Sequence, residues 1–486
     1  MINSRKDIRD FILDLENRFP VNDWQFDNLH IWPILRIRLF FFLIRKTEFS
    51  NSKSAVIPTK KQENKKSALG NRVDKLLSIF NYCSMILSLR SLKYLFVAHD
   101  NHRVEHLGKR FNRFFDVLID RYHIEKYSMY LEPDHQDKKT LYRGKSVYSY
   151  TKALKGYLFL RKFKSHDTLH FEGARFSEFL EFLSQNELTK DFALTNSKEK
   201  LTRWYNYKAK PRLDFFSIIL AKFNPLQVSV LCYYSEDIMM LLVIANRLGI
   251  KTVEMQHGPQ SDVHMCYSNW NSIPAHGYDV LPRIFWSWDE NSSKIMKRWT
   301  NDQGLYTSIV AGHPWFDYWK NQTEMNTSFE YILYSLQPDP VTLDKLFHPG
   351  VVQLIKTTKE KWFIRLHPRQ LGQLPIIKQH LADLGILNLV VLEQATNDPL
   401  PLILSNAKIH VTHYSGTLIE AASLGIKTIL FSPIGVHSFS QYINDGAAVY
   451  LDTDDAHLKE KFYLELENAS TKRENDNAKE TIQDLF

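Results

Sequence analysis

The stretch AKIHVTHYSGTLIEAASLGIKTILFSP, residues 407–433, contains the pattern from which the fold class can be predicted. It opens with a short apolar run that predicts a buried parallel strand, continues into the turn HYSGT, and then shows the apolar spacing of a helix that ends at glycine. Ser415, Gly416 and Thr417 fall where the first N–H groups of that helix are unpaired, which suits the turn to a phosphate group. Thr417 and Glu420 also have the spacing of a capping box, so capping and phosphate binding both remain open here.

The same order of strand and polar loop recurs earlier in the chain. QVSVLCYYSED at 227–237 is an apolar strand pattern that runs into an acidic turn, and KTVEMQ is followed by the loop HGPQSD. WFIRLHPRQ repeats the pattern in the second half of the chain. Parallel strands of one sheet end at the same edge, so we expect the polar groups at these ends to line a ligand site. These groups are Glu236, Asp237, His257, His367 and Arg369.

A further strand candidate, KYLFVAHD at residues 93–100, precedes the polar loop NHRVEHLGKR. Loops of this kind border the ligand crevice of open α/β sheets. The candidate contacts in this region are His99, His102, Arg103 and Lys109.

The alternation of strand and helix patterns predicts an α/β protein with two Rossmann-like domains, whose parallel sheets face one another across a cleft. The expected parts are a helical segment with a Lys-rich linker at 1–92, a first Rossmann-like domain at 93–312, a second at 313–455, and a charged helix with a tail at 456–486.

Composition narrows the class of partner. The 486 residues include 62 basic and 54 acidic side chains, a formal net charge of +8 that suits an anionic partner such as a sugar nucleotide, a lipid-linked phosphate or a membrane surface. No nucleic-acid-binding module is recognisable, so we expect no nucleic-acid partner. Cys83, Cys232 and Cys266 lack the spacing of a disulfide framework or a zinc site. With no signal-peptide core and no stretch as long as a membrane span, the expected location is cytoplasmic.

The aromatic segment IWPILRIRLFFFLIRK at 31–46 has two interpretations. Its length and its internal arginines favour a packed helix, and an interfacial membrane anchor is the alternative. The Lys-rich segment at 47–75 predicts a solvated linker. If the anchor forms, the two segments predict peripheral contact with the cytoplasmic face of the inner membrane, with Lys60, Lys61, Lys65 and Lys66 supplying positive charge.

Four motifs occur in an order that resembles the GT-B type bacterial surface-polysaccharide glycosyltransferases. They are QHGP at 256–259, SIVAGHPWFD at 308–317, RLHP at 365–368 and HYSGTLIEAASLGIKTILF at 413–431. The order looks like that of the CDP-glycerol glycerophosphotransferases, and the HP and Ser/Thr motifs are similar to those of polysialyl and Kdo transferases that use CMP-sugars. The chain has SGT where a pair of serines is usual and GHPWFD where GYPRND-like residues occur. These departures bear on the donor and leave the two-domain fold unchanged.

The resemblance implies a glycosyltransferase that moves a sugar from a nucleotide-activated donor, CMP- or CDP-linked, to a capsule or lipopolysaccharide glycan that is free or lipid-linked. It implies His257 as general base, His367 as a donor-phosphate contact, and Ser415 and Thr417 as the donor loop. The first domain would then bind the acceptor and the second the nucleotide sugar. We expect inversion of configuration without a metal or other cofactor, because basic side chains and the turn can stabilise the departing phosphate.

Arg369 and Gly416 join this expected donor site, and Glu420 is a candidate partner for ribose hydroxyls. Catalysis by Glu236 or Asp237, with retention, remains an alternative, because a carboxylate at a strand end can act as nucleophile or base. Three further alternatives concern function: a glycerophosphotransferase-like polymerase, a nucleotide-sugar epimerase of similar fold, and a non-catalytic scaffold for polysaccharide assembly.

Overall fold

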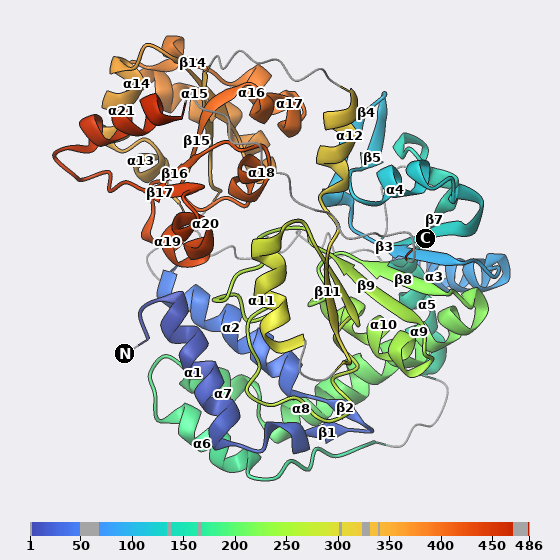
Figure 1. Cartoon of the computed structure of the whole chain (residues 1–486). Helices are drawn as coiled ribbons and strands as arrows, with labels where there is room; N and C mark the ends of the chain where they lie inside the picture. The colour runs from blue at the N-terminus through green and yellow to red at the C-terminus, as the bar shows by residue number, and fades with distance from the viewer. Residues whose placement is uncertain are drawn as a thin grey trace.

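The computed structural model describes residues 2–48, 68–133, 138–162, 168–300, 304–322, 331–338, 341–469 and 485. Within this part of the chain, two parallel sheets form the centres of two α/β domains (Figure 1). The predicted α/β class with two parallel-sheet domains is confirmed.

The N-terminal sheet contains seven described strands in the order β11-β10-β9-β8-β3-β6-β7, all paired in parallel. Their bounds are β3 Tyr94–Val97, β6 Ser128–Glu132, β7 Val147–Ser149, β8 Gln227–Val230, β9 Lys251–Met255, β10 Ile284–Ser287 and β11 Thr307–Val310. The C-terminal sheet has six described strands in the order β14-β13-β12-β15-β16-β17, also parallel. Their bounds are β12 Tyr331–Ser335, β13 Lys361–Arg365, β14 Val390–Val391, β15 Ala407–Thr412, β16 Thr428–Leu430 and β17 Ala448–Tyr450.

Helices cover both sheets, and two short antiparallel hairpins lie outside them. The N-terminal helices are α1 Arg5–Arg18, α2 Trp32–Glu48, α3 Ala68–Ser88, α4 Phe115–Arg121, α5 Tyr150–Arg161, α6 Phe176–Ser184, α7 Lys190–Thr195, α8 Lys198–Trp204, α9 Lys210–Phe223, α10 Glu236–Arg247 and α11 Glu290–Thr300. The C-terminal helices are α12 Pro314–Gln322, α13 Leu343–Leu346, α14 Pro349–Thr357, α15 Leu374–Asp383, α16 Glu393–Asn397, α17 Leu400–Ser405, α18 Thr417–Ser423, α19 Pro433–Ser438, α20 Ser440–Asn444 and α21 Leu458–Asn468. The hairpins are β1 Gln25–Phe26 with β2 Leu29–His30, and β4 Arg103–His106 with β5 Lys109–Asn112.

The strands read as apolar runs because both faces of a parallel sheet are covered. All four residues of β8 and all five of β12 are buried. On one face of the N-terminal sheet, α9 and α10 pack against each other and against α5 and β9. The apolar runs that predict these strands are therefore explained by burial on both faces of each sheet.

Helix α2 settles the two interpretations of the aromatic segment. Its apolar residues are buried except Phe41 and Phe42, which are half-buried and pack against the same core. Arg36 is fully buried, with its guanidinium 3.6 Å from the ring centroid of Trp270 and its Nε 3.5 Å from Glu16 Oε1. Packing of this kind leaves no apolar face for lipid, so the packed helix is confirmed and the anchor is wrong. Lys60, Lys61, Lys65 and Lys66 lie outside the described residues.

The sequence boundary predicted at 312/313 falls between the last strand of the first sheet and the first strand of the second. Helix α12 begins there and packs against α4 of the N-terminal domain and α17 of the C-terminal domain. Helix α21 packs into the second core, where Phe462 stacks on Trp362 at 5.7 Å between ring centroids.

Helix α1 also touches both domains. Its N-cap Ser4 and Asp7 form a reciprocal capping box, and Arg5 in its first turn pairs with Glu48 at 2.7 Å. The Arg5 guanidinium also donates to Ser438 Oγ at 3.3 Å and lies 5.8 Å from the Tyr414 ring centroid. Across the described ranges, we find no helix that combines the length and the apolar character needed to cross a membrane.

Candidate active site

Strand ends from the two sheets meet at Gly416 and Pro259. Gly416 lies in the turn after β15, and Pro259 lies in the loop after β9. A Cβ added to Gly416 would lie 3.0 Å from Pro259 Cδ and 3.2 Å from its Cγ, tighter than most carbon contacts. The carboxyl edges of the two sheets therefore approach each other here, and the loops that carry His257 and Ser415 lie together.

His257 is held between two partners of the N-terminal domain. Its Nε2 lies 3.3 Å from the Tyr234 hydroxyl, and its Nδ1 lies 3.9 Å from Oε1 of Glu254 in β9. Burial, with a contribution from the positive charge of Arg113, lowers the pKa of His257 to about 4. The imidazole is therefore neutral near pH 7, the form in which a histidine accepts a proton.

Glu254 is a carboxyl group within the sheet itself. Its Oε1 accepts hydrogen bonds from the Tyr233 N–H at 3.1 Å and the Tyr267 hydroxyl at 3.0 Å, while its Oε2 is buried without a hydrogen-bond partner among the described residues. Burial raises the pKa of Glu254 to about 8. The group is thus largely protonated near neutral pH and lies directly behind His257.

Arg113, in the loop between β5 and α4, supplies positive charge to this junction. Among the described residues no hydrogen bond or ion pair engages its guanidinium, and its Nε is buried without a partner. Burial lowers the pKa of Arg113, and the negative charge of Glu420 opposes that shift. An arginine with unused donors beside neutral histidines is suited to an anion.

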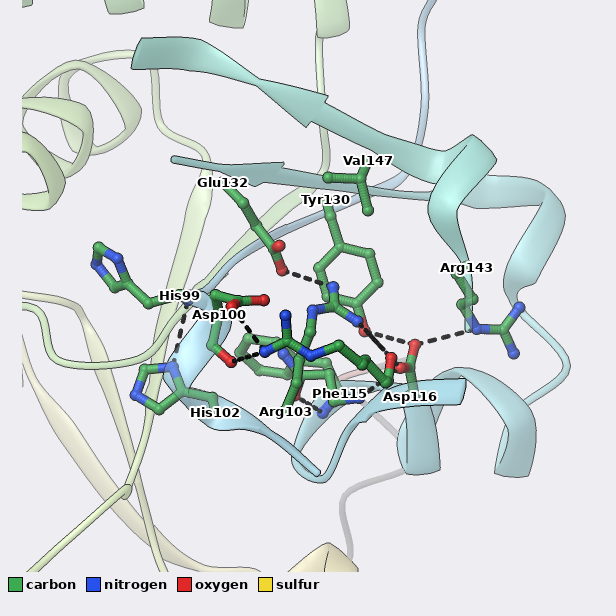
Figure 2. Close-up of polar contacts among 12 residues, drawn as sticks. His99, Asp100, His102, Arg103, Phe115, Asp116, Tyr130, Glu132, Arg143 and Val147 are labelled. Atoms are coloured by element: carbon green, nitrogen blue, oxygen red, sulfur yellow. Dashed lines mark hydrogen bonds and ion pairs between the residues drawn. The ribbon is translucent and has the colours of Figure 1, made fainter. Parts of the chain in front are cut away.

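A buried ion network fixes the elements on either side of Arg113 (Figure 2). Arg103 Nη2 donates to Glu132 Oε1 at 2.9 Å and Arg103 Nη1 lies 3.7 Å from Asp116 Oδ2, while the Tyr130 hydroxyl donates to Asp116 at 2.8 Å. All three charged side chains of this group are fully buried. The network ties β4 and α4 to the end of β6, so Arg103, a candidate ligand contact in the sequence, instead holds structure.

The network also has an electrostatic signature. Burial raises the pKa of Asp116 to about 6, against the opposing effect of its hydrogen bond from the Asn112 N–H and of Arg103. Beside it, the His99 N–H donates to His102 Nδ1 at 3.3 Å, and the ring centroids of His102 and His257 are 6.1 Å apart. Burial lowers the pKa of His102 to about 2, so a second neutral histidine stands next to His257.

Glu420 is contacted by His313, in the loop between β11 and α12 that joins the two domains. His313 Nε2 lies 3.5 Å from Glu420 Oε1, and its ring lies 4.2 Å from that of Trp288 and stacks on Phe114 at 5.5 Å. The Glu420 carboxylate faces His313, the capping box suggested by Thr417 and Glu420 does not form, and the N-cap of α18 is Gly416 without a side-chain cap.

The C-terminal domain adds basic groups at the end of β13. Arg365 Nη1 donates to the carbonyl oxygens of Ala395 at 2.5 Å and Asp398 at 2.8 Å, and burial lowers its pKa to about 10. His367 Nδ1 accepts from the Arg369 N–H at 3.1 Å, and burial, aided by Arg369, lowers the pKa of His367 to about 4. The Arg369 side chain itself is exposed.

In the turn between β15 and α18, Ser415 and Thr417 are hydrogen-bonded to each other. Their hydroxyl oxygens are 3.0 Å apart, and the Thr417 N–H donates to Ser415 Oγ at 3.3 Å. The two side chains are half-buried, as is Gly416, so the turn keeps partial access to solvent.

The structure does not bring Glu236 and Asp237 to His257. Glu236 accepts from Arg38 Nη2 at 3.2 Å and Trp204 Nε1 at 3.0 Å. Asp237 accepts from Arg212 Nε at 2.5 Å and the Tyr150 hydroxyl at 3.2 Å. Both carboxylates thus anchor the first turn of α10. Lys109, on β5, donates to the Lys139 carbonyl at 2.9 Å and is exposed.

Four residues of the junction were not singled out from the sequence. Glu254 had a signal, because it is a charged residue inside an apolar strand pattern, and His313 and Arg365 lie within motifs quoted for the resemblance. Arg113, in RFNRFF, had none. Among the described residues, no group of three or more His, Cys, Asp or Glu side chains is arranged to hold a metal ion.

No protein-family model matches the chain, and no curated protein matches its sequence. Solved structures similar to it include the UDP-GlcNAc 2-epimerase of Methanocaldococcus jannaschii in complex with UDP-GlcNAc and UDP, at 12% identity and a TM-score of 0.43 over 80% of this chain and 96% of that one. Another is MurG of Acinetobacter baumannii, at 11% identity and a TM-score of 0.43 over 81% and 98% of the two chains. At these scores the fold assignment rests on the two parallel sheets of the chain itself.

Proposed function

We propose that this chain is a glycosyltransferase that moves a sugar from a nucleotide-activated donor to a hydroxyl group of a growing capsule or lipopolysaccharide glycan. The observation that carries the proposal is Arg113, a half-buried side chain whose Nε is buried without a hydrogen-bond partner among the described residues and whose positive charge acts on His257 and on His367 of the other domain. One anion between the domains would use these unused donors.

On the donor side, the departing nucleotide phosphate gains negative charge as the glycosidic bond breaks. Arg113 and Arg365 supply positive charge for it, and His367 with the Ser415–Thr417 turn supplies hydrogen-bonding groups. These residues make a metal-independent reaction chemically reasonable, because fixed cations stabilise the same developing charge as a metal ion. Arg369, exposed beside His367, suits the outer part of the nucleotide.

On the acceptor side, His257 accepts the proton of the attacking hydroxyl at Nε2, where that hydroxyl takes the place of the Tyr234 hydroxyl, which lies 3.3 Å from this atom in the free protein. The resulting imidazolium has its Nδ1 facing Glu254. Because Arg113 contributes to the low pKa of His257, an anionic donor that neutralises Arg113 raises the basicity of His257. Donor binding therefore prepares the base for the acceptor.

The test is a thermal-shift panel of CMP, CDP, UDP, GDP and their sugars, followed by incubation of the stabilising donor with and without a glycan acceptor. Specific binding to the native state must raise the unfolding temperature. Sugar transfer to the acceptor with the donor unchanged in its absence supports the proposal. Epimerised donor without acceptor would identify an epimerase, transfer of a glycerophosphoryl group a glycerophosphotransferase, and the absence of any shift a non-catalytic scaffold.

A further inference from the structure

Tyr234 occupies the nitrogen atom with which His257 would act as a base. Tyr234 lies in the loop between β8 and α10, and its hydroxyl is 3.3 Å from His257 Nε2. Whichever of the two atoms carries the shared proton, Nε2 cannot accept another proton while this hydrogen bond lasts. The free protein therefore holds its candidate base in an engaged state.

The loop that carries Tyr234 has an unusual backbone. Cys232 has a φ of 59°, in the left-handed region that residues other than glycine seldom adopt, and its carbonyl accepts from the Ser235 N–H at 3.2 Å. The Tyr233 side chain is fully buried, and its hydroxyl donates to the Cys266 carbonyl. The turn thus places one tyrosine in the core and leaves the next at the site, and strained turns are concentrated at functional sites.

The Tyr234 hydroxyl also has a second partner. Burial raises the pKa of the Cys232 thiol to about 12, and a hydrogen bond with Tyr234 opposes that shift. Burial raises the pKa of Tyr234 well above its ordinary value, so the phenol keeps its proton at neutral pH. With a sulfur atom as well as a nitrogen atom in reach, the hydroxyl can leave His257 and still keep a hydrogen-bond partner.

Two further rings limit the movement of Tyr234. The ring centroids of His264 and Phe41 lie 5.7 Å and 5.9 Å from that of Tyr234. All three side chains are half-buried, so this side of His257 keeps partial access to solvent. These contacts favour a small displacement of the hydroxyl over removal of the whole ring.

We propose that Tyr234 covers Nε2 of His257 in the free protein and gives it up to the acceptor hydroxyl but not to water. The proposal rests on the glycosyl transfer proposed above and adds a choice between two nucleophiles. An acceptor glycan can displace the phenol because its other contacts contribute binding free energy, whereas water has only its own hydrogen bonds. Tyr234 acts through His257 and is therefore a positioning residue.

The suppressed side reaction is hydrolysis of the donor. In that reaction the oxygen of water bonds to the anomeric carbon of the sugar, and a proton of the water passes to His257 Nε2. The bond from the anomeric carbon to the phosphate oxygen breaks, and the nucleotide leaves with its electron pair. While the phenol stays on Nε2, water has no base to take its proton, so a bound donor is kept for the acceptor.

Chemical modification of the full-length protein tests the cover without any substrate. Diethylpyrocarbonate acylates neutral imidazole, and peptide mass spectrometry gives the rate at each histidine. His257 Nδ1 is buried, so its rate reports on Nε2. Tyr234→Phe should raise this rate by about two- to tenfold, the factor that one ordinary hydrogen bond contributes. The exposed His276 is the internal reference, and Tyr463→Phe, which loses a hydroxyl bonded to the Thr357 carbonyl, should keep the wild-type rate.

A second variant acts in the opposite direction. Cys232→Ala removes the alternative partner of the phenol, so we expect the modification of His257 to become slower than in the wild type. Unfolding temperatures equal to that of the wild type show that the variants are folded. Equal rates at His257 in the wild type and Tyr234→Phe overturn the proposal, whether or not the chain transfers sugar.

The division between transfer and hydrolysis tests the consequence. With donor alone, Tyr234→Phe should release free sugar about tenfold faster than the wild type, because a free base assists water. With acceptor present, its KM for the acceptor should fall by about two- to tenfold at little change in kcat, since no phenol has to be displaced. A lower kcat with unchanged hydrolysis overturns the proposal. If the rates of modification differ but no variant transfers sugar, the cover is supported and the reaction proposed above is refuted.

Discussion

The imidazole of His313, in the loop that joins the two domains, and the carboxylate of Glu420, in the C-terminal domain, lie 3.5 Å apart. Glu420 is also the acidic group that acts most strongly on Arg113 and Arg365, opposing the lowering of their pKa values by burial. One carboxylate therefore balances two guanidiniums and one histidine in the free protein. A bound phosphate would add to the negative charge that Glu420 supplies there, with smaller contributions from Asp398 at Arg365 and Asp317 at His313.

Replacing Arg113 tests the anion site directly. We expect Arg113→Gln to weaken binding of the stabilising nucleotide by roughly ten- to a hundredfold, because a charge-assisted contact to phosphate is lost. Arg113→Lys should retain only part of the wild-type nucleotide affinity, since an ammonium lacks the paired donors of a guanidinium. Isothermal calorimetry measures both, with the exposed Arg18→Gln as control. Equal affinity in the wild type and Arg113→Gln would show that Arg113 does not bind the nucleotide.

Replacing His257 tests the base. His257→Ala should reduce turnover by about a hundredfold or more while donor affinity stays within about twofold, because the base acts on the acceptor in the transition state. Glu254→Gln should reduce kcat less and displace the acidic limb of the kcat profile, since Glu254 acts through His257. Steady-state kinetics across pH separates the two. Wild-type turnover in His257→Ala would remove that residue from the mechanism.

Replacing Gly416 tests the contact between the domains. In Gly416→Ala the new Cβ meets Pro259 at 3.0 Å, and we expect about a tenfold loss of kcat because the strand ends that carry the reacting groups are displaced. The φ of −59° at Gly416 suits alanine, so the backbone itself is not strained. Pro259→Ala in the same chain should restore activity. If the double variant remains as slow as Gly416→Ala, contact with Pro259 is not the cause.

The buried histidines predict sensitivity to acid. Burial lowers the pKa values of six of them to between about 2 and 4, at His102, His257, His264, His367, His410 and His413. The unfolded chain binds protons at these groups near pH 6.5 and the folded chain does not. Stability is therefore present above about pH 6.5 and falls as pH decreases toward 4, by at most about 1.4 kcal/mol per pH unit for each histidine.

Four carboxyl groups act in the opposite direction, because burial also raises the pKa values of Glu16 and Asp289. Asp116 and Glu254 have pKa values raised to about 6 and about 8, so their contributions to stability increase as pH falls through those values. Because the six histidines outnumber these carboxyl groups, the net effect of lowering the pH below 6 is a loss of stability. Urea denaturation at pH 7 and pH 5 measures it. A free energy of unfolding that is equal or larger at pH 5 would contradict this balance.

Much of this arrangement was predictable because strand burial is written in the sequence. The runs that end before His257, His367 and Ser415 are apolar because both faces of their sheets are covered, and the next polar residue necessarily lies at the sheet edge. The position of a polar residue at a strand end does not show whether its side chain is paired with another residue of the protein. Glu236 and Asp237 satisfied the same rule, but Arg38 and Arg212 neutralise them from distant helices.

Arg113 is a site residue that the sequence pattern could not predict. It lies between a hairpin and a helix rather than at the end of a sheet strand, and its position depends on the ion network of Arg103, Asp116 and Glu132. These partners are brought together only by folding. Helix α2 shows the same limit, since Arg36 is covered by Trp270, a residue far along the chain.

The contact of Arg5 with Ser438 and Tyr414 bears on the construction of hybrid proteins. Proteins with two such domains invite exchange of halves between relatives, with the crossover placed near Gly312. In this chain that crossover would divide the contact between two parents, because α1 travels with the first half and α19 with the second. A hybrid in which these surfaces match must take residues 5–48 and 433–444 from the same parent, so the exchangeable unit is discontinuous in sequence.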